Sequence, residues 1–137
     1  RQGIKIEKEL APDLPRVRLD RQQIKQVLLN LLLNAVDSMA KSGGRLRVQT
    51  RKLMKPGDIV WVHIEIKDTG EGIQETNLDH VFDPFFTTKH ASGEHEGTGL
   101  GLTIVHQIIQ EHHGEIRVES SVGVGTTFFV SLPALPA

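Results

Sequence analysis

The sequence predicts an α+β domain in which helical segments alternate with strands. Residues 60–66 alternate apolar and polar side chains, the period of a strand with one buried face. Residues 21–40 repeat apolar side chains at helical spacing, between an N-cap at Asp20 and two glycines after Ser42. A chain of 137 residues is long enough for a single domain, 1–137, with its own buried core.

The composition excludes several classes of protein. Sixteen basic and seventeen acidic residues leave a formal charge of -1, so no overall field favours nucleic acid or an anionic membrane. The absence of cysteine excludes disulfides, thiolate metal sites and a cysteine nucleophile, and it weakly favours the cytoplasm. No apolar run approaches the roughly 18 residues of a membrane span, and the first residues do not resemble a signal peptide. Because the chain starts without Met and in mid-pattern, we expect a fragment of a longer protein.

The first part of the chain predicts two short strands and a long helix. Residues 4–7 and 16–19 alternate apolar and charged side chains on either side of the turn 11–15. The helix at 21–40 is apolar over most of its circumference, which predicts burial on nearly all sides. Its polar side chains fall in one seam, because spacings of three, four and seven share a helix face. These residues are Gln23, Gln26, Asn30, Asn34 and Asp37. A buried helix with one polar seam usually faces a polar site.

The rest of the chain predicts more strands than helices. Residues 45–51 form a hairpin with 60–66, and 115–120 pairs with 126–132 around a glycine-containing turn. Two helices are expected, a short one at 75–81 and a longer one at 102–113. Residues 90–97 lack periodicity and predict a mobile loop. Thr126 is in phase with the apolar residues of its strand, so its hydroxyl is predicted to point inward.

Asp68 follows the strand 60–66 in phase with its apolar side chains, which places the carboxylate on the core side. Burying an unpaired carboxylate costs roughly several kcal/mol, so protein, water or a ligand must supply donors. Gly70 and Gly72 remove side chains from the next turn, so a flat ligand could approach the backbone there. Adenine fits, because its amine donates to a carboxylate, whereas guanine presents a carbonyl oxygen. An ordinary Asp-Gly turn after a strand is the alternative.

A second glycine-rich segment, Gly97-Thr98-Gly99-Leu100-Gly101, opens the predicted helix at 102–113. Free backbone N–H groups and the helix dipole make such a position an anion site. The segment lacks the Lys-Ser/Thr of a P-loop and follows a loop instead of a strand, so neither a Walker nor a Rossmann motif fits. Simple helix capping by these glycines is the alternative.

Five motifs in this order resemble the catalytic and ATP-binding domain of two-component sensor histidine kinases, in the wider family of DNA gyrase B, Hsp90 and MutL. They correspond to the N box at 30–35, the G1 box at 68–73, the F box at 81–86, the G2 box at 97–102 and the final G box at 125–128. The resemblance covers nearly the whole chain and has the character of nitrogen-regulation sensors. It implies a two-layer α/β sandwich, the Bergerat ATP-binding fold. A mixed sheet would carry three main helices on one face, with a lid at about 83–99.

By position, the resemblance implies ATP and Mg²⁺ as cofactors. Asp68 would take the adenine amine, helped through water by Thr126, and Asn34 would give an oxygen to Mg²⁺, a hard ion that prefers oxygen. Asn30 stands where hydrolysing relatives carry a glutamate. An amide cannot act as a general base, which favours transfer to another acceptor over hydrolysis. Further nucleotide contacts are expected from Gly70, Gly72, Ile73, Phe86, Lys89, Gly97, Thr98, Gly99, Leu100, Gly101 and Leu102.

Asp37 departs from the resemblance, because many histidine kinases carry a cation there to meet the phosphates. Lys89 is the candidate replacement, and a solvated loop lysine is the alternative. The seven histidines include none in a phosphoacceptor motif, and the adjacent pair at 112–113 cannot share a metal from one helix. Trp61 lies on the outer sheet face with Ile59 and His63, where it could dock a missing helical domain. A partly covered surface tryptophan is the alternative.

The resemblance also implies partners. A separate dimerisation and phosphoacceptor domain would carry the histidine, and a response regulator would be reached through the longer kinase. The fragment would be a monomer in the cytoplasm and the longer kinase a homodimer, with membrane anchoring left open. Two rival functions are an ATP-gated clamp with weak ATPase activity, against which Asn30 stands, and a non-catalytic nucleotide sensor. Asn34 and the glycine loops stand against the sensor.

Overall fold

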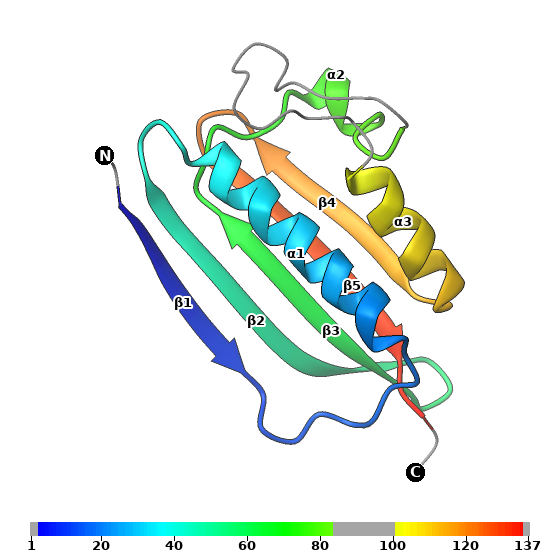
Figure 1. Cartoon of the computed structure of the whole chain (residues 1–137). Coiled ribbons are helices and arrows are strands. Elements are labelled where there is room, and N and C mark those ends of the chain that lie inside the picture. The colour runs from blue at the N-terminus through cyan, green and yellow to red at the C-terminus, as the bar shows by residue number, and fades with distance from the viewer. Residues whose placement is uncertain (1–2, 84–100, 136–137) are drawn as a thin grey trace.

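The computed structural model describes residues 3–83 and 101–135, and these form two layers (Figure 1). One layer is a five-stranded sheet in the order β1-β2-β3-β5-β4. Its strands are β1 (Ile4–Leu10), β2 (Gly44–Lys55), β3 (Ile59–Asp68), β4 (Glu115–Ser121) and β5 (Gly125–Pro133). The helices are α1 (Arg21–Ser38), α2 (Glu75–Leu78) and α3 (Gly101–Glu111). β1 and β2 pair in parallel and the other pairs are antiparallel, so the predicted mixed sheet and two-layer sandwich are confirmed.

The sheet topology brings several chain ends to one place. β3 and β4 both run antiparallel to β5, so their last residues lie beside the first residues of β5. α1 also ends over this end of the sheet, as Figure 1 shows. Polar residues that are far apart in the sequence therefore meet at one end of the sheet.

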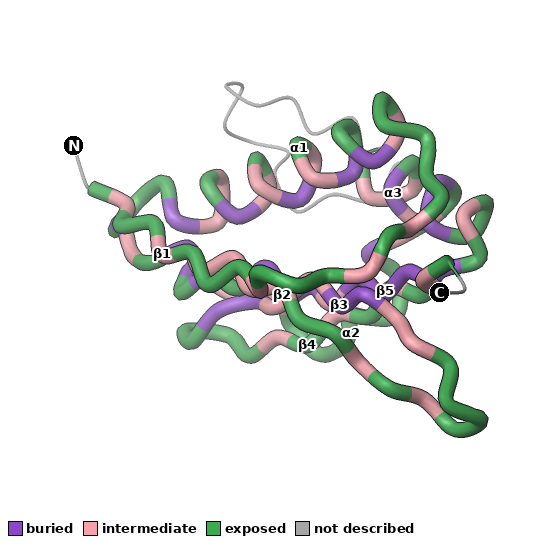
Figure 2. Tube along the Cα trace, turned by 90° about the horizontal axis from the view of Figure 1, so that it is seen from below, coloured by how far each residue is buried: buried purple, intermediate pink, exposed green. Residues whose placement is uncertain are grey.

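α1 begins and ends close to its predicted bounds, but its burial was predicted wrongly. The Asp20 side chain accepts a hydrogen bond from the backbone N–H of Gln23 at 3.0 Å, which caps the first turn. One stripe faces the sheet and is buried, namely Ile24, Val27, Leu31 and Ala35. Leu29 and Leu33 are instead about half exposed, at 51% and 48%. Figure 2 shows that exposed segments recur along the whole of α1. A helix on the outside of a two-layer domain must turn one face to solvent, whatever its leucine content.

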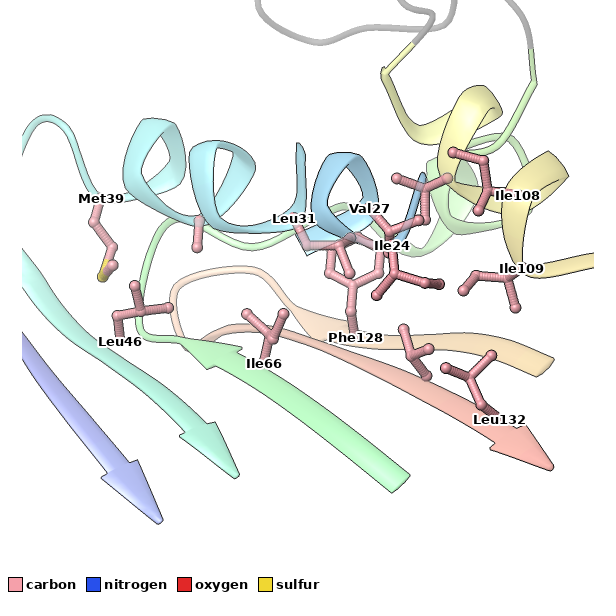
Figure 3. Close-up of a cluster of buried hydrophobic side chains, with 13 residues drawn as sticks. Ile24, Val27, Leu31, Met39, Leu46, Ile66, Ile108, Ile109, Phe128 and Leu132 are labelled. Atoms are coloured by element: carbon pink, nitrogen blue, oxygen red, sulfur yellow. The ribbon is translucent and has the colours of Figure 1, made fainter. Parts of the chain in front are cut away.

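The core fills the space between the helices and the sheet (Figure 3). α1 contributes its buried stripe, α3 contributes Val105, Ile108 and Ile109, and the sheet contributes Leu46, Ile66, Phe128, Val130 and Leu132. Fully burying one such side chain stabilises a fold by about 1.5–3 kcal/mol. This continuous core fixes the position of α1 over the end of β3.

Residues 16–19, which were predicted as a strand, belong to a connection without regular structure. Val17 packs partly against the core while its charged neighbours face solvent, and this produces the alternation. The chain must cross here from the sheet layer to the start of α1. His112 helps to anchor it, because its Nε2 accepts a hydrogen bond from the backbone N–H of Asp20 at 2.9 Å.

The other predicted elements are present with small shifts at their ends. The hairpin of β2 and β3 and the pair of β4 and β5 are confirmed. The short helix is only the single turn α2, and α3 starts one residue before its predicted beginning. None of the described helices combines the length and apolar character that crossing a membrane requires.

Candidate functional site

Asp68 is the last residue of β3, and its side chain is only 3% exposed. One carboxylate oxygen, Oδ1, accepts a hydrogen bond from the backbone N–H of Gly70 at 2.8 Å. The Ser38 hydroxyl, at the end of α1, donates to the same oxygen over 3.5 Å. The predicted inward direction of Asp68 is therefore confirmed. Part of the cost of its burial is offset by donors from the turn and from α1.

The glycines of the turn after Asp68 are required by close packing of the protein itself. A Cβ at Gly70 would collide with the hydroxyl and backbone carbonyl of Ser38, and a Cβ at Gly72 would collide with the carbonyl of Ser121. Gly72 also has a φ of +79°, which favours glycine. Protein atoms thus fill the space that we expected these glycines to leave for a flat ligand. Their main effect is to let the turn pack between α1 and the β4–β5 turn.

Thr126, near the start of β5, lies directly opposite Asp68 in the strand register. It is 4% exposed, so the inward direction predicted for it is confirmed. Its hydroxyl lies 2.8 Å from the hydroxyl of Ser120 on β4. The sequence patterns did not single out Ser120 or Ser38. The alternation along β4 could nevertheless have indicated Ser120, because this polar residue is in phase with the inward-facing Ile116 and Val118.

Asn30 connects α1 to the first residue of α3. Its side-chain oxygen accepts a hydrogen bond from Gln26 Nε2 at 2.7 Å, and its Nδ2 donates to the Gly101 carbonyl at 3.1 Å. Asn34 and Asp37 continue the same seam towards the end of α1, and both are partly buried. The predicted polar seam therefore runs along α1 from the start of α3 to the end occupied by Asp68.

Several predicted site residues lie outside the described part of the chain. These are Phe86, Lys89, Gly97, Thr98, Gly99 and Leu100, together with nearly all of the predicted lid at 83–99. The described residues on either side of this gap are joined to each other. Phe82 packs edge-on against Phe128 with ring centroids 6.4 Å apart, and Thr103 donates a hydrogen bond to the Phe82 carbonyl at 2.9 Å. Leu102 packs partly against the core.

Comparison with known proteins agrees with this arrangement. Residues 19–136 match the family model described as histidine kinase-, DNA gyrase B- and HSP90-like ATPase. The chain belongs to this ATPase family. Its core also superimposes on the catalytic domain of the histidine kinase ThkA, with a TM-score of 0.78 and 34% identity, over 97% of this chain and 82% of that one.

Curated relatives of this ATPase domain are named as kinases. This chain is 40% identical to sporulation kinase E of Bacillus subtilis (strain 168) over 96% of this chain and 16% of that protein. It is 42% identical to the signal transduction histidine-protein kinase AtoS of Escherichia coli (strain K12) over 93% of this chain and 19% of that protein. The chain therefore spans about a fifth or less of the length of these two relatives.

Within the ATPase domain, the lining of an open hollow of about 330 Å³ includes Ser120, whose hydroxyl contacts that of Thr126. The hollow is lined by Ile73, Glu75, Leu78, Ser120, Ser121 and Val122, so it lies between α2 and the β4–β5 turn. Asp68 and Thr126 are not in its lining. In residues 3–83 and 101–135, no three or more His, Cys, Asp or Glu side chains are grouped to hold a metal ion.

Proposed function

We propose that this domain binds Mg-ATP and transfers the γ-phosphoryl group to a histidine on a separate helical domain, within two-component signal transduction. The observation that carries the proposal is the buried carboxylate of Asp68, held at the end of β3 opposite the buried Thr126 in the strand register. Membership of the ATPase family supports ATP as the ligand. One structural neighbour is the crystal structure of full-length ShkA in complex with AMPPNP, an ATP analogue.

The chemistry of this pair fits an adenine. An ionised carboxylate only accepts hydrogen bonds, and a buried one gains most from a donor that replaces its lost water. The adenine amine offers two such donors, one of which Asp68 would accept. Thr126 would assist through a water molecule. Ile73 would flank the base from this turn, and Gly70 and Gly72 would contribute by letting the turn pack against Ser38 and Ser121.

At the phosphate end, Asn34 would contribute its side-chain oxygen to Mg²⁺, and the glycine segment 97–101 with Leu102 would hold the phosphates at the start of α3. Phe86 and Lys89 would complete the site from the lid. Bound Mg-ATP would supply the phosphoryl group, with the metal offsetting its charge. Asn30 carries an amide that cannot remove a proton from water, and its Nδ2 already donates to Gly101. This chemistry favours transfer over hydrolysis.

The names of the relatives support the kinase assignment, and their length supports further domains. Sporulation kinase E and AtoS are several times longer than this chain. We therefore place the acceptor histidine in a dimerisation and phosphoacceptor domain of the longer protein, which would pass the phosphoryl group to a response regulator. The isolated domain would be monomeric and cytoplasmic, the longer kinase homodimeric, and no nucleic acid would be involved.

Incubation with labelled ATP tests this function. The isolated domain should bind ATP without acquiring acid-labile label. Transfer requires an acceptor nitrogen roughly 3–3.5 Å from the phosphorus and in line with the leaving oxygen, and none of the seven histidines lies in a phosphoacceptor motif. Added helical domain from the same kinase should become labelled in acid-labile form. Acid-labile label on the isolated domain would contradict the proposed division of labour. Release of free phosphate without transfer would favour the weak-ATPase clamp, and binding with neither reaction would favour a nucleotide sensor.

A further inference from the structure

Ser120 joins three segments through a single hydroxyl group. The backbone N–H of Ile73, in the turn after β3, donates to Ser120 Oγ at 2.7 Å. Ser120 Oγ donates to the Gly125 carbonyl at 2.9 Å and lies 2.8 Å from Thr126 Oγ1. The hydroxyl therefore has three partners, one in the turn, one at the first residue of β5 and one in the candidate adenine pair.

Counting protons fixes the direction of the hydrogen bond between Ser120 and Thr126. A serine hydroxyl has one hydrogen to donate and two lone pairs that accept. The Gly125 carbonyl only accepts, so it takes the hydrogen of Ser120. The N–H of Ile73 only donates, so it takes one lone pair. The remaining lone pair of Ser120 must accept from Thr126, and the Thr126 hydroxyl is therefore the donor in that bond.

This direction has a consequence for any ligand beside Asp68. Because Thr126 uses its hydrogen on Ser120, it presents only lone pairs to other partners. Asp68, opposite it in the strand register, also presents only acceptors when ionised. At the 6-position of a purine, both groups could therefore accept a hydrogen bond from an amine, directly or through a water molecule, and neither could donate one to a carbonyl oxygen.

We infer that Ser120 is a positioning residue that sets nucleotide specificity, by holding the Thr126 hydroxyl in the accepting orientation that prefers a 6-amino purine to a 6-oxo purine. The inference rests on the proposed function, since it concerns the adenine end of the same site. Without Ser120, the Thr126 hydroxyl is free to turn its hydrogen towards the ligand. Discrimination against a 6-oxo purine then depends on Asp68 alone.

The test compares the affinities of ATP and ITP, which differ at the 6-position of the base and in the proton on N1, by titration of the whole domain. Wild type should bind ATP more tightly than ITP. Ser120→Ala should reduce the ratio of the two affinities by about five- to tenfold, the effect of one neutral hydrogen bond. Ser121→Ala is the matched control, because this neighbouring serine is exposed, and it should leave the ratio unchanged.

A double-mutant cycle separates this role from a structural one. Thr126→Val should also lower the ratio, and adding Ser120→Ala to Thr126→Val should lower it no further, because Ser120 acts through Thr126. If Ser120→Ala fails to fold, Ser120→Cys is the alternative variant. It keeps the side-chain volume but hydrogen-bonds more weakly, so it should also lower the ratio of the two affinities. Ser120→Thr, which keeps a hydroxyl group, should retain the wild-type ratio.

The outcomes distinguish failure of the inference from failure of the function. If wild type binds neither nucleotide, or binds both equally, the proposed function is wrong at the adenine end. If wild type prefers ATP and the Ser120 variants keep the same ratio, the function stands and the inference is wrong. An equal loss of affinity for both nucleotides would also overturn it, because Ser120 would then only hold the turn at Ile73.

Discussion

Two polar side chains on β3, Asp68 and His63, are both buried, but on opposite faces of the sheet. Asp68 is 3% exposed on the face that α1 covers, and His63 is 6% exposed on the face turned away from α1. Around Asp68, backbone and hydroxyl donors come from the turn and from the end of α1. Burial there is built by loops that converge on one end of the sheet.

His63 is buried by its neighbours on the outer face instead. Its Nδ1 lies 3.1 Å from Ser131 Oγ, and its ring lies 5.7 Å from that of Phe129. Its Nε2 has no hydrogen-bond partner among the described residues. Burial lowers the pKa of His63 below its usual value of 6.5, and the positive charge of Arg51 lowers it further.

The outer face also shows how Trp61 is covered. The Lys55 ammonium lies 3.9 Å from the centre of its ring and forms an ion pair with Glu115 at 2.7 Å. Trp61 is partly covered and His63 is buried, which leaves Ile59 exposed. The three residues therefore do not form an open apolar patch. The two faces thus bury a polar side chain in different ways. Asp68 is buried where a turn and a helix end converge, which is where we place the candidate site, whereas His63 is buried by side chains of its own sheet face.

The largest expected effect is the loss of nucleotide binding in Asp68→Ala. A charge-assisted hydrogen bond of about 1.5–3 kcal/mol would be lost, which weakens ATP binding by about tenfold to hundredfold. Titration with a fluorescent ATP analogue measures this. Glu65→Ala, on the same strand but the outer face, is the control and should bind normally. A change below about threefold in Asp68→Ala would remove Asp68 from the adenine site.

Asn34→Ala should have a narrower effect, because it spares the adenine end. We expect nucleotide binding to persist while its dependence on Mg²⁺ is largely lost, since an oxygen ligand of the ion is removed. Titration of ATP with and without Mg²⁺ in both proteins gives the comparison. An unchanged response to Mg²⁺ would show that Asn34 does not hold the ion.

His63 should make the domain less stable in acid without affecting nucleotide binding. Its pKa is lower in the folded than in the unfolded chain, so the unfolded chain binds more protons as the pH falls below 6.5. The free energy of unfolding therefore falls progressively as the pH drops below 6.5, and above that pH His63 causes no such loss. Urea unfolding at pH 8 and pH 5 should show a smaller acid loss for His63→Phe than for wild type.

The control for His63→Phe is His113→Asn, which removes an exposed histidine at a position with a φ of 60° that asparagine tolerates. It should retain the acid loss of wild type. An equal acid loss in His63→Phe would mean that the buried imidazole does not contribute to it.

The smallest effect is expected at the ion pair that covers Trp61. Glu115→Gln should cost no more than about 1 kcal/mol of unfolding free energy, because exposed ion pairs contribute about 0.2–1 kcal/mol and are screened by salt. Urea unfolding at low and high ionic strength measures it. A loss well above this range, persisting at high salt, would show that the outer face depends on specific polar contacts as the Asp68 end does.

The sequence alone determined the order of the elements and the faces of the strands. A period of two is a local property of the chain, so it predicts that Asp68 and Thr126 both point to the inner face, whichever residues they contact there. The same local logic gave the N-cap at Asp20 and the polar seam of α1.

Only the tertiary structure decided which polar groups meet. The bonds of Ser120 to Ile73 and Thr126 depend on the register of β4 with β5 and on the return of the turn after β3. The exposure of Leu29 and Leu33, the irregular path of residues 16–19 and the burial of His63 likewise depend on what the other layer or the neighbouring strands cover. Periodicity reports the direction of a side chain, whereas burial and pairing depend on contacts between segments far apart in the chain.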